Sequence, residues 1–239
     1  MKRVLSAFTL LLMSLCSLSA QKIVRFEDEL SGLYGYKQQG KIIIEAQFVQ
    51  AAKEFSEGLA AVKIGKTDMY NPDSFYNWGY IDIKGNIVIK PLFYEAHDFS
   101  EGVASVNTKE DGWGFINHNG EFIKLDKSVT YLGIVREGLA PFRCEVNTVL
   151  TRGPRWGAMN KEGNTVVPPI YLNMPYFESG FALVEVDHHI EDYVYINLKG
   201  EEISKYVHDI SEANRLLKLY KKTEKGKAYM QWYNNTFNK

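Results

Sequence analysis

The sequence predicts a mainly β protein: tandem repeats of short antiparallel hairpin or meander units, stacked like a solenoid, with an α-helical cap at the C-terminus. Three observations predict this fold class. An aromatic residue followed by glycine occurs four times, at intervals of 44, 35 and 43 residues. A second glycine turn follows each aromatic residue by 24 or 25 residues, and the runs between turns are rich in aromatic and β-branched residues. Self-similarity at a fixed period of about 20–50 residues indicates a repeat architecture.

The pattern of residues 1–20 predicts a signal peptide. Two basic residues precede an apolar run, and Ser19-Ala20 offers a small-residue cleavage site. A transmembrane helix is disfavoured, because a span needs about 20 apolar residues and serines interrupt this run. We therefore expect an exported protein, periplasmic, on the outer surface or secreted, with no integral membrane insertion after the signal is removed.

The chain has two cysteines, and each has a functional alternative. Cys16 would suit a lipoprotein signal, but Leu15 before it is bulkier than the small residue that such a signal needs, so lipidation is the less favoured interpretation. After signal cleavage only Cys144 remains, so no internal disulfide can form and stability must come from burial. A nucleophilic Cys144 would need a histidine and a positive environment, and we expect a partly buried, inert thiol instead.

Charge is unevenly distributed along the chain. Residues 21–204 contain 18 basic and 26 acidic side chains, whereas residues 205–239 contain eight basic and three acidic ones. Nucleic-acid binding depends on a basic surface that contacts phosphates, so the acidic body argues against nucleic acid as a partner. The two parts carry opposite charge and should attract each other.

We expect one repeat domain over residues 21–204. Its units, the last of them partial, lie near residues 33–65, 78–107, 113–143, 156–186 and 193–204. In each unit two short strands flank a first glycine turn, and a third strand follows the second glycine turn and leads into the next unit. Pro91 and Pro168 should mark where strand pairing stops, because proline lacks the ladder N–H. Asx-turn chemistry is expected at the polar residues before the first turns, Asp82, Asn117, Asn160 and Asn197.

Two motifs recur in fixed phase, a start W-G-[YF]-[IM]-[DN]-x-x-G and a later run F-S-E-G-x-A. Together they resemble the WG (tryptophan-glycine) repeat family of bacterial proteins over about residues 33 to 204. The resemblance implies an exported protein that binds partners and gives little further functional detail. The first and last copies depart from the pattern, as expected where a stack ends and must cover its edge. Tyr34, Tyr193 and Val194 are the departures in these two copies, and Leu125 and Ser179 are further departures in the third and fourth copies.

The repeated residues are expected to hold the units together. Tryptophan buries a large area and glycine lets a neighbouring backbone approach, so the Trp-Gly pair suits packing between units better than a ligand-stacking ladder. The turn glycines should supply positive φ, and the adjacent glutamates should accept local hydrogen bonds. The structural set is Trp78, Gly79, Gly85, Glu101, Gly102, Trp113, Gly114, Gly120, Glu137, Gly138, Trp156, Gly157, Gly163 and Gly180.

The sequence predicts no catalytic, cofactor or metal site. Glu57, Glu101 and Glu137 would suit a glycosidase, which needs two carboxylates a few ångström apart, but repeated residues more often do one structural job in every unit. The segment Asp187-His188-His189-Ile190-Glu191-Asp192 has metal-ligand residue types, yet adjacent histidines on a strand point apart, which favours a solvated loop. The sequence has no nucleophile elbow, phosphate loop, dinucleotide fingerprint or H-E-x-x-H motif.

The sequence pattern of residues 205–239 predicts a helical segment. Asp209 and Glu212 resemble a capping box, apolar residues then fall on one helical face, and Gly226 should break the helix. Residues 228–233 suit a second short helix or an apolar anchor. A basic amphipathic helix could touch an anionic membrane or a partner, but a cap on the last unit is preferred because the acidic body can receive it.

We expect a non-enzymatic exported protein that presents a binding surface to an unknown protein or envelope polymer, without a cofactor. Candidate partner contacts lie in a variable connection, although a loop tucked onto the stack explains them equally; they are Tyr70, Phe75 and Tyr76. The alternative is a glycan-acting hydrolase of the cell envelope. It predicts a concave cleft with two carboxylates and a raised pKa on one of them.

Overall fold

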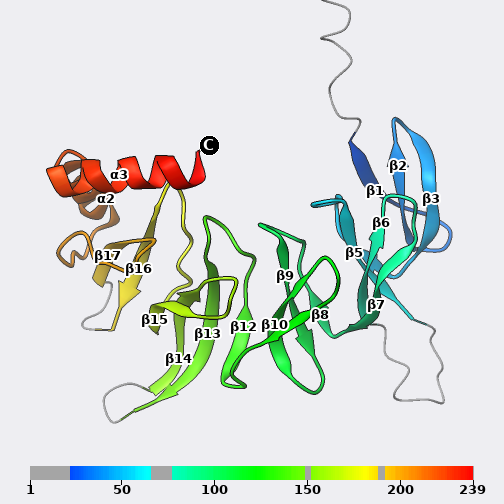
Figure 1. Cartoon of the computed structure of the whole chain (residues 1–239), viewed down its shortest axis with the longest axis horizontal. Helices are drawn as coiled ribbons and strands as arrows, with labels where there is room; N and C mark the ends of the chain where they lie inside the picture. Colours follow the sequence, from blue (N-terminus) through cyan, green and yellow to red (C-terminus); the bar gives the residue numbers. More distant parts are fainter. Residues whose placement is uncertain (1–21, 66–76, 149–151, 188–191, 239) are drawn as a thin grey trace, which may run out of the picture. The chain divides into compact units, whose positions relative to one another are not determined.

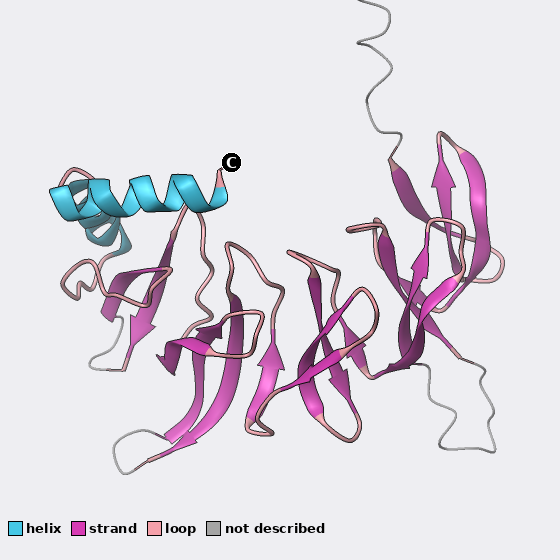
Figure 2. Cartoon of the chain, viewed as in Figure 1, coloured by secondary structure: helices cyan, strands magenta, loops and turns pink. Residues whose placement is uncertain are grey.

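The computed structural model describes residues 22–65, 77–148, 152–187 and 192–238, so the predicted signal peptide lies outside the described residues. The chain divides into two compact units, Met1–Leu92 and Phe93–Lys239, which are described separately. The described residues form small antiparallel sheets, none of which closes on itself, and a pair of helices follows at the C-terminus (Figures 1 and 2). The mainly β fold class is confirmed. No helix in the described ranges is long and apolar enough to cross a membrane.

The first unit contains two sheets. One has the strand order β1-β2-β3 and consists of β1 (Ile23–Glu27), β2 (Tyr34–Gln38) and β3 (Lys41–Phe48). The other has the order β4-β5-β6-β7 and consists of β4 (Gln50–Ala51), β5 (Leu59–Ile64), β6 (Asn77–Asp82) and β7 (Ile87–Phe93). The two sheets share one hydrophobic core, which includes Tyr36, Phe48, Val62 and Ile81.

The second unit contains three sheets and the helix pair. The first sheet has the order β11-β10-β9-β8, from β8 (Glu95–Ala96), β9 (Val103–Thr108), β10 (Gly112–Asn117) and β11 (Phe122–Lys124). The next has the order β12-β13-β14-β15, from β12 (Val129–Leu132), β13 (Ala140–Asn147), β14 (Arg152–Met159) and β15 (Thr165–Tyr171). The last pairs β16 (Phe181–Val186) with β17 (Asp192–Asn197).

Each sheet after the first takes its strands from two successive sequence repeats. The strand after a Glu-Gly turn pairs along its length with the Trp-Gly strand of the following repeat, as β5 does with β6, β9 with β10 and β13 with β14. We expected the third strand of each repeat to lead into the first strand of the next repeat, and this connection is a hairpin within one sheet. A short outer strand, not expected from the sequence, is added at β4, β8 and β12. In the first sheet β1 lies beside β2, at the position that the strand of the preceding repeat holds in the other sheets.

The second turn of each repeat, which carries a Glu-Gly pair in the first three repeats, is a two-residue hairpin turn with positive φ at both positions. Glu101 has φ 55° and Gly102 has φ 89°, and the flanking Ser100 and Val103 exchange backbone hydrogen bonds of 2.8 and 3.2 Å. A turn of this type matches the right-handed twist of the strands it joins and requires a residue that tolerates left-handed φ. The same geometry recurs at residues 57–58, 137–138 and 179–180.

From the second repeat onward, the first turn is held by an Asp or Asn side chain. Asp82 Oδ1 accepts hydrogen bonds from the backbone N–H groups of Lys84 and Asn86, both at 2.9 Å. The same bonds form at Asn117 and Asn197. These are the Asx turns that the sequence predicts.

The expectation that prolines end strand pairing is wrong. β7 runs through Pro91 and β15 runs through Pro168. Both strands lie at the edge of their sheets, where a missing N–H interrupts no central ladder. The register of β15 against β14 is also irregular around this point, so the prolines fall at a bulge.

The glycine of the Trp-Gly pair makes room for its own hairpin partner, not for a neighbouring repeat as expected. A Cβ on Gly79 would lie 2.6 Å from the carbonyl oxygen of Ile89 and 2.9 Å from the nitrogen of Pro91. A Cβ on Gly157 would lie 2.5 Å from the carbonyl oxygen of Val167. The edge strand therefore crosses directly over the glycine, which a side chain would prevent.

The C-terminal segment forms α2 (Ile210–Tyr220) and α3 (Glu224–Phe237). Asp209 caps α2, as the sequence predicts, and accepts a hydrogen bond from Ser211 N at 2.9 Å. The expected break at Gly226 is wrong, because Gly226 lies in the first turn of α3. A Cβ there would lie 2.0 Å from the carbonyl oxygen of Tyr220, so the glycine allows α3 to start directly against the end of α2.

We predict that Gly79→Ala lowers the free energy of unfolding by about 1–3 kcal/mol, because the added methyl group overlaps the backbone of β7. Urea unfolding followed by far-UV circular dichroism measures the change. Gly32→Ala is the matched control: a Cβ at Gly32 meets nothing within 4 Å, and the substitution carries only the cost of its φ of 67°. Equal effects of the two variants would contradict the close approach.

Candidate functional site

Carboxylates join the Glu-Gly turns of the second unit to one another. The backbone N–H of Gly138 donates a hydrogen bond to Glu101 Oε2 at 2.9 Å, so the side chain of one turn binds the backbone of the next. The expectation of a local hydrogen bond by these glutamates is therefore wrong. A two-residue hairpin does not use the N–H groups of its central residues in its own ladder, so they need an acceptor from elsewhere.

Glu137 repeats this contact one turn further along the chain. Its Oε1 accepts from Ser179 N at 2.9 Å and its Oε2 accepts from Gly180 N at 2.8 Å. The hydroxyl of Tyr233 in α3 donates to Oε1 at 2.8 Å. Three donors therefore engage this carboxylate. Glu101 and Glu137 act as structural acceptors between turns, a role that leaves little support for the glycosidase interpretation.

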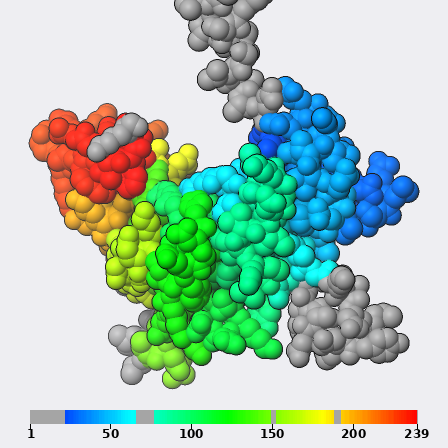
Figure 3. Space-filling model, turned by 45° about the vertical axis from the view of Figure 1, so that its right-hand side comes forward, coloured from blue at the N-terminus to red at the C-terminus, as the bar shows by residue number. Residues whose placement is uncertain are grey.

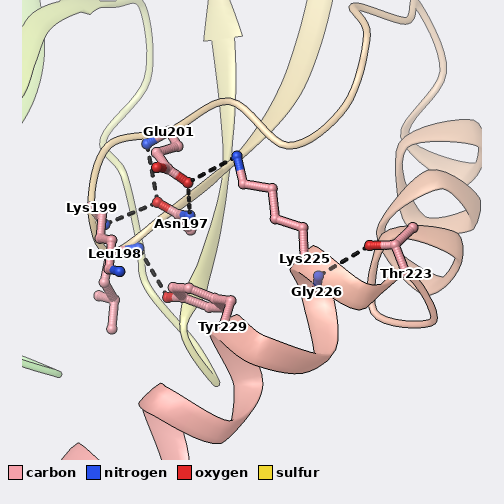
Figure 4. A network of polar contacts seen from close by, with 8 residues as sticks. All are labelled: Asn197, Leu198, Lys199, Glu201, Thr223, Lys225, Gly226 and Tyr229. Atoms are coloured by element: carbon pink, nitrogen blue, oxygen red, sulfur yellow. Dashed lines mark hydrogen bonds and ion pairs between the residues drawn. The ribbon is translucent and has the colours of Figure 1, made fainter.

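Helix α3 lies against the last turn, where no further Glu-Gly turn follows. The Tyr229 hydroxyl donates to Gly180 O at 2.7 Å and accepts from Leu198 N at 3.1 Å. Figure 4 shows this hydroxyl directed from α3 to Leu198, and Lys225 reaching Glu201 at 3.3 Å. Burial raises the pKa of Tyr229 to about 12, so its hydroxyl remains a donor at neutral pH. The space-filling view shows the red C-terminal residues lying directly against the orange and yellow residues that precede them (Figure 3), and side chains of α2 and α3 share a core with β16 and β17.

The tryptophans of the two Trp-Gly pairs of the second unit contact the same ring, that of Tyr131. Trp113 is 4% exposed, its Nε1 donates to the backbone oxygen of Thr130 at 3.2 Å, and its ring centre lies 5.7 Å from that of Tyr131. The ring of Tyr131 also lies 5.4 Å from that of Trp156. Tyr131 is thus held between two tryptophans of successive repeats. In the first unit Trp78 is half-buried in β6.

A pocket of about 180 Å³ opens beside this aromatic group, and we name it the Arg136 pocket. It gathers residues from the segments between strands: the start of the turn that carries Glu137, the stretch before β16, and the end of β12. Its lining is His97, Tyr131, Gly133, Ile134, Arg136, Leu139, Pro141, Met174, Pro175, Tyr176 and Phe177. These side chains are mostly apolar or aromatic, and Arg136 is the permanent cation among them.

Arg136 lies at the rim of the pocket with its guanidinium over an aromatic ring. Its Cζ is 5.7 Å from the ring centre of Tyr176, and its Nη1 donates to the Tyr176 hydroxyl at 3.3 Å. Within the described ranges no carboxylate oxygen lies within 4 Å of a nitrogen of Arg136. Burial lowers the pKa of His97, another lining residue, below its ordinary value, which favours the neutral imidazole at pH 7. The guanidinium therefore carries the charge of the pocket.

Cys144 is buried in β13 and lines a second pocket of about 310 Å³. Burial raises the pKa of its thiol, and the nearby carboxylates of Glu145 and Asp126 raise it further. A protonated, buried thiol is a poor nucleophile. This environment agrees with the inert thiol that the sequence predicts.

Several sequence-derived candidates lie outside the described residues. They include the expected partner contacts Tyr70, Phe75 and Tyr76, and most of the polar segment at 187–192. Among the described residues no group of three metal-ligating side chains could hold an ion. The Arg136 pocket was not predicted, because most of its lining lies in connecting segments and its rim residues Arg136 and Tyr176 do not recur from repeat to repeat. The arginine directly before Glu137 was an available signal, because the two preceding repeats have Ser56 and Ser100 at this position and the following one has Glu178.

The sequence model of the family described as WG containing repeat matches residues 36–67, 78–110 and 156–187. The repeat at 113–143, which has Leu125 in place of the proline, lies outside these matches. A search of curated proteins finds no match.

Among solved structures, the computationally designed Ika8 protein is similar at 9% identity and a TM-score of 0.40. The match covers 80% of this chain, which spans 58% of the length of that protein. The computationally designed Ika4 protein is similar at 10% identity and a TM-score of 0.29, over 64% of this chain and 88% of its own. At these TM-scores neither similarity supports a conclusion about fold or function.

We predict that Glu137→Ala lowers the free energy of unfolding by about 2 kcal/mol, because it leaves two backbone donors and a tyrosine hydroxyl without their charged acceptor. Tyr233→Phe removes one of the three bonds and should cost about 1 kcal/mol. Glu145→Ala, at an exposed position of β13, is the control and should change stability by less than about 0.5 kcal/mol. Urea unfolding provides the comparison, and a Glu137→Ala variant as stable as the control would refute the role of the carboxylate.

Proposed function

Since this chain is a member of the WG-containing repeat family, we propose that it is a non-enzymatic, exported binding scaffold. In this proposal the repeats hold the backbone rigid, and the connecting segments present a binding surface to a protein partner or an envelope polymer. Binding residues commonly lie on loops that a rigid framework positions.

The observation that supports binding most directly is the Arg136 pocket. It combines apolar walls with exposed aromatic and cationic side chains, a composition enriched in protein interfaces. Tyr176 is 54% exposed and Met174 is 38% exposed. Large apolar side chains left in water at the mouth of one pocket favour a partner that covers them.

The same pocket gives little support to a glycan hydrolase. Its lining contains no aspartate or glutamate, whereas most glycosidases use two carboxylates at the scissile bond. Its volume is about 180 Å³. Small-molecule sites typically have larger volumes, of about 300–1,000 Å³. A pocket of this size suits one side chain or ring rather than a polymer in a catalytic cleft.

Export is proposed from the signal-like pattern of residues 1–20. We predict that the full-length gene product, expressed in a bacterial host and recovered from the cell envelope or the medium, begins at Gln21. Intact-mass spectrometry gives the N-terminus directly. A chain that retains Met1 to Ala20 in the cytoplasm would overturn this part of the proposal. A mass increased by a lipid, with Cys16 as the first residue, would instead identify a lipoprotein.

We predict that immobilised full-length protein captures a component of envelope extracts through the Arg136 pocket. Tyr176→Ala should remove the captured component, because the exposed ring forms the rim of the pocket. Tyr94→Ala is the matched control, since Tyr94 is 40% exposed and does not line the pocket. Incubation with envelope polysaccharides runs in parallel, and release of a product would overturn the non-enzymatic proposal.

A further inference from the structure

We infer that the Arg136 pocket binds a peptide segment of a protein partner, in which a large apolar side chain is flanked by an acidic residue. The inference rests on the proposed binding function and adds the chemistry of the occupant. It follows from the walls of the pocket, the charge at its rim, its size and its rigidity.

The walls fit a large apolar side chain. Leu139 and Phe177 are buried at 5% and 6% exposure, and Ile134 and Pro141 lie beside them. A side chain that enters this space leaves water and gains contacts with apolar atoms on several sides. Met174 at the mouth has a flexible, polarizable thioether, which adapts to aliphatic and aromatic partners alike.

The rim fits a carboxylate. Arg136 is exposed, and its described contacts are with Tyr176, a neutral group. A guanidinium presents a planar fork of donors that binds a carboxylate through two parallel hydrogen bonds. Glu101 and Glu137, the glutamates of the Glu-Gly turns in the second unit, bind backbone N–H groups of the turns that follow them. The charge of Arg136 therefore remains available for an acidic residue of the partner.

The lining disfavours a neutral sugar. Sugar hydroxyl groups need several acceptors and donors, and the pocket contains no Asp, Glu, Asn, Gln, Ser or Thr side chain. Its volume of about 180 Å³ suits one large side chain. Of the two partner classes in the proposed function, the protein partner therefore fits this pocket better.

The pocket is also preorganised. Tyr131 lines it and is fixed by ring contacts with Trp113 at 5.7 Å, Trp156 at 5.4 Å and His97 at 6.1 Å. Arg136 lies one residue before Glu137, whose side chain is bound by the next turn. Groups held in this way lose little conformational entropy on binding.

Nine synthetic peptides of equal length test the inference. Each has a central Phe, Leu or Ala, flanked on both sides by Glu, Gln or Lys, and binding to the full chain is measured by fluorescence anisotropy. We expect the Glu-flanked Phe and Leu peptides to bind at least about tenfold more tightly than the Ala-centred or Lys-flanked ones. Arg136→Gln should abolish the preference for Glu over Gln while preserving that for Phe over Ala. Arg215→Gln, on exposed α2, is the matched control and should change neither preference.

Circular dichroism of each variant separates loss of binding from loss of folding. The inference is overturned if the peptides bind without preference for Glu, if Arg136→Gln keeps that preference, or if a neutral hexose oligosaccharide displaces the Glu-flanked Phe peptide. If no peptide binds while envelope capture still depends on Tyr176, the peptide chemistry is wrong and the binding function stands. If no peptide binds and capture also fails, both proposals are wrong.

Discussion

The second unit depends on one constraint: each two-residue Glu-Gly turn leaves backbone N–H groups that its own hairpin cannot satisfy. The turns solve this in series, because Glu101 binds the backbone of the following turn and Glu137 binds the one after it. At the last turn Ser179 replaces the glutamate. The Tyr229 hydroxyl of α3 donates to Gly180 O there, and the Tyr233 hydroxyl donates to the Glu137 carboxylate that binds this turn. A repeated pair of residues is therefore explained by hydrogen-bond satisfaction between successive repeats.

The same row of turns positions the variable residues. Arg136 directly precedes Glu137, and Tyr176 lies three residues before Ser179, so both pocket residues are attached to a hydrogen-bonded turn. The turns fix the backbone, and the fold does not restrict which residue types occupy these positions. The surface chemistry can therefore change without a change of fold. The structure thus separates the residues that hold the repeats together from those proposed to contact a partner.

The fold class and the Asx turns could be predicted from the sequence because they follow from local patterns: strand-forming runs, glycine spacing and a polar residue before each turn. The pairing of strands from successive repeats could not, since a period shows where units recur and not where a sheet begins. Gly226 was misread because its role is a close approach to Tyr220, a contact between two helices. The Arg136 pocket was missed for the same reason: Tyr131, Arg136 and Tyr176 meet only once the sheets are packed.

The pairing of halves from adjacent repeats has an evolutionary consequence. Because β13 comes from one period and its partner β14 from the next, duplication of any whole period, wherever its boundaries fall, inserts a complete hairpin with both ladder partners present. Loss of half a period would instead leave one β-strand without its ladder partner. An array built in this way can lengthen or shorten in steps of one period with every ladder pair kept.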